Sequence, residues 1–138
     1  MNVQDMEKCF ACGPANKEGL QLCFEHDKGL AKAQVVLDDI YQGYPGIAHG
    51  GIVTTLLDEA MVHALVDIDI LAVTARLEVR FHNPVPVGER LTVQGRLEEN
   101  KSSRRIKYLS AQILDDDENV LASGVGKFLD QTRKILQS

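Results

Sequence analysis

The most constraining feature of this sequence is one long apolar stripe that follows a His-Gly-Gly turn. Between residues 50 and 68, apolar side chains recur at steps of three and four, which is the spacing of one buried face of an α-helix. The stripe comprises Ile52, Val53, Leu56, Leu57, Ala60, Met61, Ala64, Leu65 and Ile68. No glycine or proline interrupts it after Gly51, so the pattern predicts a helix from about Gly50 to Val66.

The start of this helix is unusual because two glycines follow His49 directly. Serine, threonine or aspartate would normally cap the free N–H groups at such a position. Gly50 and Gly51 instead allow another group to approach these donors closely. The donors lie at the positive end of the helix dipole, so the sequence indicates a place where negative charge on an oxygen atom is stabilised.

Two carboxylates, Asp58 and Glu59, interrupt the otherwise apolar helix. Glu59 has His63 four residues further on, the spacing of a side-chain pair on one helix face. Donors at a helix start, with a carboxylate two turns along, suit acyl transfer, because one part holds an oxyanion and the other activates water or attacks a carbonyl. Taken singly, each feature is also typical of a solvated helix face or a tight turn.

Length and composition favour one domain over residues 1–138, large enough to close a core. We expect a polar, turn-rich segment over residues 1–19, with a short helix near residues 5–10, and a frayed tail over residues 130–138. The net charge of -5 argues against a nucleic-acid partner, and no apolar run is long enough for a membrane span. The N-terminus lacks the basic and apolar parts of a secretory signal, so we expect a cytoplasmic protein.

Three cysteines occur in the chain, and two of them form the Cys-x-x-Cys pair Cys9 and Cys12. A structural zinc site needs four ligands, and no second cysteine or histidine pair follows at a suitable spacing. A βαβ pattern, which a thioredoxin-like redox motif requires, is also absent from the surrounding sequence. We therefore expect reduced thiols, no metal and no resident cofactor.

The rest of the chain alternates with the period of two that is typical of strands. Residues 20–25 and 31–37 predict a hairpin around an Asp-Lys-Gly turn, and four further strands are predicted after the helix, over residues 73–82, 91–97, 105–114 and 120–129. In the first of these four, the residues predicted to face the core are Val73, Ala75, Leu77, Val79 and Phe81.

This order of elements predicts an α+β fold in which an antiparallel sheet of about six strands wraps around one long central helix. Such a sheet has an open edge, and open edges favour pairing with another chain. We therefore expect a homodimer or a higher even assembly, such as a homotetramer built as a dimer of dimers.

The combined motifs resemble the hotdog fold and, more narrowly, the PaaI-like acyl-CoA thioesterases. The resemblance covers most of the chain and rests on the segments at residues 9–20, 41–51, 57–60 and 84–88. It implies an acyl-CoA substrate and a site at a dimer interface. Asp58 matches the catalytic carboxylate, acting as general base or nucleophile, and Gly50 matches the glycine whose N–H polarises the thioester carbonyl. His49 matches the motif histidine, which acts as a positioning residue rather than as the base. Thr74 falls at the position where related enzymes carry a serine or threonine that helps to hold the attacking water.

The resemblance also indicates residues that bind the substrate. Many relatives carry an asparagine about six residues before the histidine, where this chain has Gly43, so the neighbouring Gln42 is a candidate for the missing amide. Gly51 lies beside the oxyanion donor. Leu57, Met61 and residues of the loop at 41–47 are candidates for the acyl pocket. Three basic residues near one β-turn are candidates for binding coenzyme A phosphates, although solvated hairpin charges fit the pattern as well: Lys101, Arg104 and Arg105.

Two other functions remain open on this scaffold. An acyl-thioester dehydratase or hydratase needs a histidine and an acid that converge on one substrate carbon, and its surrounding motifs differ from His49-Gly50-Gly51. A non-catalytic acyl-CoA sensor would bind the same ligand without turnover, although the intact Asp58 and Gly50 argue against it. The sequence leaves the acyl-group preference undetermined.

Overall fold

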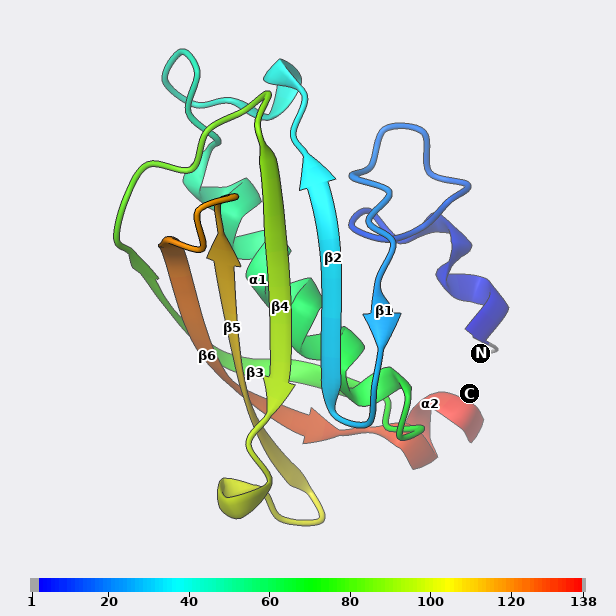
Figure 1. Cartoon of the computed structure of the whole chain (residues 1–138). Helices are drawn as coiled ribbons and strands as arrows, with labels where there is room; N and C mark the ends of the chain where they lie inside the picture. The colour runs from blue at the N-terminus through cyan, green and yellow to red at the C-terminus, as the bar shows by residue number, and fades with distance from the viewer. Residues whose placement is uncertain (1–2, 138) are drawn as a thin grey trace.

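The computed structural model describes the fold of residues 3–137, in which an antiparallel sheet curls around one long helix (Figure 1). The helix, α1, spans Gly50–Val66, the bounds that the apolar stripe predicts. The strands are β1 (Glu25–His26), β2 (Leu30–Val36), β3 (Ala72–Phe81), β4 (Arg90–Leu97), β5 (Ile106–Leu114) and β6 (Val120–Asp130). Their order in the sheet is β1-β2-β4-β5-β6-β3, which confirms the predicted six-stranded α+β architecture.

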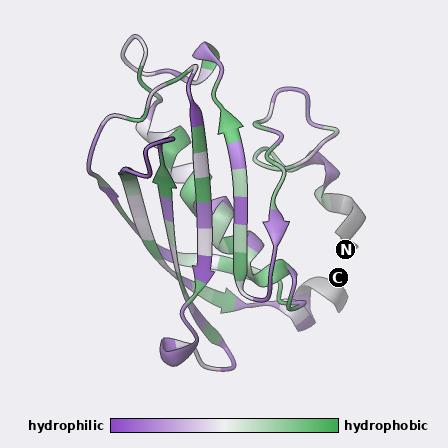
Figure 2. Ribbon diagram, in the orientation of Figure 1, coloured by the Kyte–Doolittle hydropathy of each residue, from purple (hydrophilic) through white to green (hydrophobic). Residues whose placement is uncertain are grey.

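Helix α1 fills the concave side of the sheet. Its residues Leu56, Leu57, Ala60, Met61, Ala64 and Leu65 have no exposed surface. Hydropathy varies from residue to residue along β2 and β4 (Figure 2). The buried residues alternate with more exposed ones along both strands, and Ala31, Ala33, Leu91 and Val93 belong to the core. The approach is closest at Gly95, where an added Cβ would lie 2.0 Å from the carbonyl oxygen of Ala60. Only glycine fits there, because this neighbour is backbone that cannot move aside.

The first predicted strand is mostly wrong, because only Glu25–His26 pairs with β2. Gln21 has a φ of 51°, which breaks the extended conformation. The backbone before β1 bonds instead to the N-terminal segment: Leu20 N donates to Phe10 O at 2.8 Å, and Leu22 N donates to Ala11 O at 2.9 Å. The predicted Asp-Lys-Gly turn is present, with Lys28 and Gly29 both at positive φ.

The predicted burial of β3 is also wrong in part. Val73 is 46% exposed and Phe81 is 55% exposed, and Ala75 is exposed as well. Two features explain this difference. The register against β6 shifts between Thr74 and Arg76, which interrupts the alternation, and β3 forms an edge of the sheet with one side unpaired. Leu77 and Val79 remain partly buried against the core.

Short helical segments complete the chain. The expected N-terminal helix is a 3-10 turn, Val3–Lys8, and two further 3-10 turns span Asp39–Tyr41 and Glu99–Lys101. The tail expected to fray forms a short helix, α2 (Thr132–Gln137), because Asp130 accepts a bond from Thr132 N and Gln131 N donates to Leu71 O. Within the described part of the chain, no helix is long and apolar enough to cross a membrane.

Candidate active site

The start of α1 presents one open backbone donor. The His49 ring caps the helix, because its Nδ1 accepts a hydrogen bond from Gly51 N at 2.9 Å. The His49 carbonyl accepts from Ile52 N and Val53 N. Among residues 3–137, the Gly50 N–H donates to no protein acceptor. The turn therefore leaves a single N–H available to an external oxygen at the positive end of the helix.

The loop before α1 holds this turn in place. His49 N donates to Tyr41 O at 2.9 Å, and Gly43 packs against His49, where an added Cβ would lie at van der Waals contact, 3.4 Å from His49 Cα. The Gln42 side chain is engaged within the loop, since its Oε1 accepts from Gly46 N at 3.0 Å. The Phe81 ring, at the end of β3, lies beside Gly50, with 3.7 Å between its Cζ and an ideal Cβ.

Asp58 is partly buried on α1 and is held by the edge strand. The Thr74 hydroxyl donates to Asp58 Oδ1 at 2.7 Å. Burial raises the pKa of Asp58 above its ordinary value, and the charge of Glu59 adds to this effect, while the hydrogen bond from Thr74 opposes it. A carboxylate with a raised pKa that remains accessible is a suitable general base near neutral pH.

One protomer does not bring Asp58 and Gly50 to a common point. Eight residues of helix separate them, which corresponds to about 12 Å along the axis at 1.5 Å per residue. A reacting carbonyl must lie about 3 Å from both its oxyanion donor and the attacking group. The two groups of one chain therefore cannot act on the same carbonyl.

Glu59 faces the other way, into a cluster with the N-terminal segment. Its Oε1 lies 3.2 Å from His63 Nε2, which confirms the predicted pair, and 3.8 Å from Cys9 Sγ. Burial alone would raise the pKa of Glu59, but His63 and the two thiols together lower it. Burial, and then the nearby Glu59, raises the pKa of the Cys12 thiol. This second carboxylate is thus surrounded by protein groups, whereas Asp58 is partly exposed and accepts its one described side-chain hydrogen bond from Thr74.

The predicted acyl-pocket residues and phosphate-binding residues lie in different surroundings. Leu57 and Met61 are fully buried against β6, so the protomer gives a substrate no direct access to them. Lys101 lies on the exposed turn between β4 and β5. Arg104 and Arg105 line a cavity of about 470 Å³ with residues of β6 and α2.

This cavity adds two basic residues that the sequence reasoning missed, Arg133 and Lys134, because the tail was expected to fray. The Asp-x-Thr sequence at residues 130–132 is the capping signal that predicts the helix carrying them. Ala72 pairs with Asp130 of the cavity wall, and Thr74 pairs with Phe128. The basic cavity therefore adjoins the end of β3 that carries Thr74.

A second cavity, of about 670 Å³, lies on the face of the sheet turned away from α1, with Lys32, Gln94 and Gln112 in its wall. Neither Asp58 nor Gly50 lines it. This cavity of the protomer therefore lies away from the two groups with suitable chemistry.

Residues 45–122, more than half of the chain, match the family model described as the thioesterase superfamily. The acyl-coenzyme A thioesterase THEM4 of Xenopus laevis is 31% identical over 105 residues, which are 75% of this chain and 46% of that protein, so the chain spans about half the length of this curated relative. The crystal structure of a thioesterase superfamily protein superposes with a TM-score of 0.83 and 31% identity, over 90% of this chain and 61% of that one. The PaaI protein of the Escherichia coli phenylacetic acid degradation operon gives a TM-score of 0.76 at 20% identity, over 86% of each chain.

Proposed function

Because this chain belongs to the thioesterase superfamily, we propose that it is an acyl-CoA thioesterase whose active site is shared between two protomers. The family match confirms the expected thioesterase superfamily, and the structural superpositions confirm the expected hotdog fold, which this chain shares with the PaaI protein. The activity, the substrate class and the dimer are our proposal. The relative from Xenopus laevis is named an acyl-coenzyme A thioesterase, and a Streptococcus mutans protein with the same fold was solved bound to acetyl-CoA.

The observation that carries the proposal is the placement of the two reacting groups along one edge strand. Asp58 is bonded to Thr74 near the start of β3, and Gly50 lies beside Phe81 at its end. If β3 pairs antiparallel with β3 of a second copy around a two-fold axis near the middle of the strand, the end of one β3 that carries Thr74 lies beside the end of the other that carries Phe81. Asp58 then faces the open N–H of Gly50 in the partner.

In this arrangement each group has a defined role. The thioester carbonyl oxygen accepts a hydrogen bond from the partner's Gly50 N–H, which stabilises the negative charge that develops on that oxygen. Asp58 takes a proton from water as the water attacks the carbonyl carbon, or it attacks that carbon itself. The C–S bond then breaks, and the coenzyme A thiolate leaves and takes up a proton, which on the general-base route is the one that Asp58 took from water. On the nucleophilic route, water then hydrolyses the acyl-Asp58 anhydride, which gives the free acid and restores the carboxylate.

The charges around the site agree with a coenzyme A substrate. Arg104, Arg105, Arg133 and Lys134 surround the cavity at the Thr74 end of β3 and are suited to bind its phosphates. Arg104 and Arg105 are exposed just before the start of β5, so they can contact a ligand that remains partly in solvent. Asp130 in the same wall offsets part of this positive charge.

The activity is tested by measuring thiol release from a panel of acyl-CoA substrates. We expect turnover of at least one of them and a loss of about 10²–10⁴-fold in Asp58→Ala, as is typical for removal of a general base. A hydration assay on enoyl-CoA, run in parallel, detects a dehydratase or hydratase. Binding without turnover would instead identify a sensor, and undiminished hydrolysis by Asp58→Ala would remove Asp58 from its role.

The assembly is tested separately by sedimentation at micromolar concentration. We expect a homodimer, or a dimer of dimers, both for the wild type and for Asp58→Ala, because the side chain of Asp58 is not part of the β3 edge. A monomer at that concentration would contradict the shared site.

A further inference from the structure

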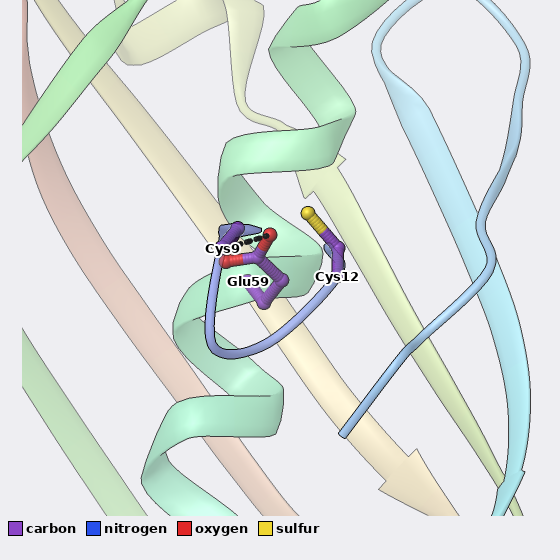
Figure 3. A group of neighbouring side chains, drawn as sticks. All are labelled: Cys9, Cys12 and Glu59. Atoms are coloured by element: carbon purple, nitrogen blue, oxygen red, sulfur yellow. Dashed lines mark hydrogen bonds between the residues drawn. The ribbon is translucent and has the colours of Figure 1, made fainter. Parts of the chain in front are cut away.

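A cluster of side chains with metal-ligating chemistry lies on a different face of α1 from Asp58. Cys9 and Cys12 come from the N-terminal segment, and Glu59 comes from α1 (Figure 3). One sulfur atom from each cysteine and one carboxylate oxygen of Glu59 all lie within 4.8 Å of one another. Only the fold brings these groups together, because 46 residues separate Cys12 from Glu59 in the chain.

The segment that carries the two cysteines is held rigidly against the rest of the protein. Gly13 N donates to Cys9 O at 2.8 Å and closes a tight turn, where an added Cβ on Gly13 would lie 2.3 Å from the backbone oxygen of Glu7. Between the cysteines, Ala11 is buried and accepts from Leu22 N. The two thiols are therefore fixed over α1 rather than carried by a loose terminus.

The position of Glu59 calls for a positive partner. Glu59 is 8% exposed, and among the residues whose burial is described it is the one charged residue that is buried. A buried carboxylate is costly unless it is paired or coordinates a metal. Its neighbours are two thiols and His63, and no lysine or arginine forms an ion pair with it in the described part of the chain.

His63 supplies a fourth candidate ligand. Its Nε2 atom is buried and lacks a hydrogen-bond partner among the described residues, although it lies 3.2 Å from Glu59 Oε1. Its other ring nitrogen, Nδ1, lies 2.8 Å from His26 Nε2, and the ring stacks on Phe24 at a centroid distance of 4.3 Å. A histidine oriented through one nitrogen, with the other nitrogen buried and directed at a carboxylate instead of a satisfied hydrogen-bond partner, has the surroundings typical of a metal ligand.

From this geometry we propose that the protein binds one Zn²⁺ ion through Cys9, Cys12 and Glu59, with His63 as the fourth ligand. Tetrahedral Zn²⁺, with bonds of about 2.3 Å to sulfur and 2.0–2.2 Å to nitrogen or oxygen, separates its ligand atoms by roughly 3.3–3.8 Å. Glu59 Oε1 lies 3.8 Å from Cys9 Sγ and 3.2 Å from His63 Nε2, which is close to this range. The ligand atoms of Cys9, Cys12 and Glu59 lie within 4.8 Å of one another, and His63 lies beside this group and would move inward on binding. Both cysteines bind as thiolates and release their protons to water, and thiolate with imidazole favours zinc over magnesium or calcium.

The sequence alone favours a metal-free protein because no second ligand pair follows Cys9 and Cys12 at a suitable spacing. The fold supplies this pair from α1, where Glu59 and His63 are four residues apart and lie on one face. The ion would join the N-terminal segment to the helix and act as a structural site. Asp58 points to Thr74 rather than into the cluster, so the proposal does not depend on the thioesterase activity.

The test uses the full-length protein, purified under reducing conditions, with metal content measured by mass spectrometry. We expect about one zinc per chain, and we expect Co²⁺ exchanged into the site to show thiolate-to-cobalt charge-transfer absorption. The variants Cys9→Ser and Glu59→Gln should lose the metal, and His63→Ala should weaken its binding by at least about tenfold. Cys23→Ser is the matched control, because that thiol is exposed and lies outside the cluster.

The outcomes separate clearly. If reduced wild-type protein binds neither Zn²⁺ nor Co²⁺, the proposal is overturned, whatever the variants do. If Cys9→Ser retains the metal, or Cys23→Ser loses it, the metal binds elsewhere, and the proposal is also overturned. If a variant fails to fold, the cobalt spectrum of the wild type still decides whether thiolates bind the ion, and unchanged affinity in His63→Ala excludes the fourth ligand.

Discussion

The Thr74 hydroxyl donates a hydrogen bond of 2.7 Å to Asp58 Oδ1, and this contact links helix α1 to the edge strand β3. It has two consequences. It fixes the orientation of the carboxylate, and it stabilises the charged form of Asp58 against the cost of burial. Thr74 is therefore a positioning residue whose effect is visible in the ionisation of Asp58.

Replacing Thr74 by valine should shift the acid limb of the pH–rate profile. The hydrogen bond from Thr74 lowers the pKa of Asp58, so its removal should raise this pKa further and move the acid limb of kcat/KM to higher pH. The profile is measured with a single acyl-CoA substrate over the acid range. Thr74→Ser keeps the hydroxyl and should keep the wild-type limb, and an unmoved limb in Thr74→Val would show that Asp58 does not control the rate.

Replacing Asp58 by asparagine should stabilise the protein at neutral pH. Burial raises the pKa of Asp58 in the folded state, so the folded protein binds the proton more tightly than the unfolded chain does. Wild-type stability therefore falls as pH rises from the unfolded pKa of about 3.9 through the folded pKa, by about 1.4 kcal/mol for each unit between the two values. Asparagine does not titrate, and it still accepts the bond from Thr74.

The free energy of unfolding, measured in denaturant at pH 7 and at pH 3, tests this expectation. Asp58→Asn should be more stable than the wild type at pH 7, and the gain should shrink or vanish at pH 3, where the wild-type carboxyl is protonated. Asp117→Asn, at an exposed position, makes the same chemical change without the burial and should leave the difference near zero. A loss of stability at pH 7 in Asp58→Asn would mean that the charge is favourable where it lies.

Local sequence signals predict the centre of this fold and fail at its edges. Helix α1 has the predicted bounds because the residues that determine them, the apolar stripe and the two glycines at the start, all lie within one continuous segment. The strand predicted over residues 20–25 fails because its backbone bonds to Phe10 and Ala11, a pairing that period-two alternation cannot reveal. The predicted burial of Val73 and Phe81 on β3 fails for another reason. Both residues are exposed, because β3 is an edge strand with one side unpaired within the protomer.

In the candidate site, too, some features can be predicted from the local sequence and others depend on the fold. The residue types and spacing of His49, Gly50 and Asp58 can be read along the helix, but the bond from Thr74 crosses 16 residues and depends on the register of β3 against β6. In the cluster of Cys9, Cys12 and Glu59, the first and last residues are 50 positions apart in the sequence, and only the cysteine pair is recognisable from the sequence itself. Resemblance to a family indicated Thr74, and only the fold indicated the cluster.

Replacing Gly50 by proline should remove the oxyanion donor while keeping the helix. Proline lacks the N–H and is favoured at the first position of a helix, and His49 already has the φ of -59° and ψ of 137° that suit a residue before proline. Turnover should fall by about 10²–10³-fold, the usual effect of losing one oxyanion donor. Gly50→Ala keeps the N–H, and its Cβ meets Phe81 at an ordinary 3.7 Å, so it should retain most of the activity. Equal losses in the two variants would indicate a steric effect instead.

A mixing experiment tests whether Asp58 and Gly50 act across the dimer. Asp58→Asn and Gly50→Pro should each be nearly inactive alone. After subunit exchange, half of the dimers are mixed, and in each of these one site receives both changes while the other receives neither. About a quarter of the wild-type activity should therefore return, because one intact site forms in every mixed dimer. If both groups acted within one chain, each site of a mixed dimer would keep one defect, so activity that stays absent after verified exchange would place the site within a single protomer.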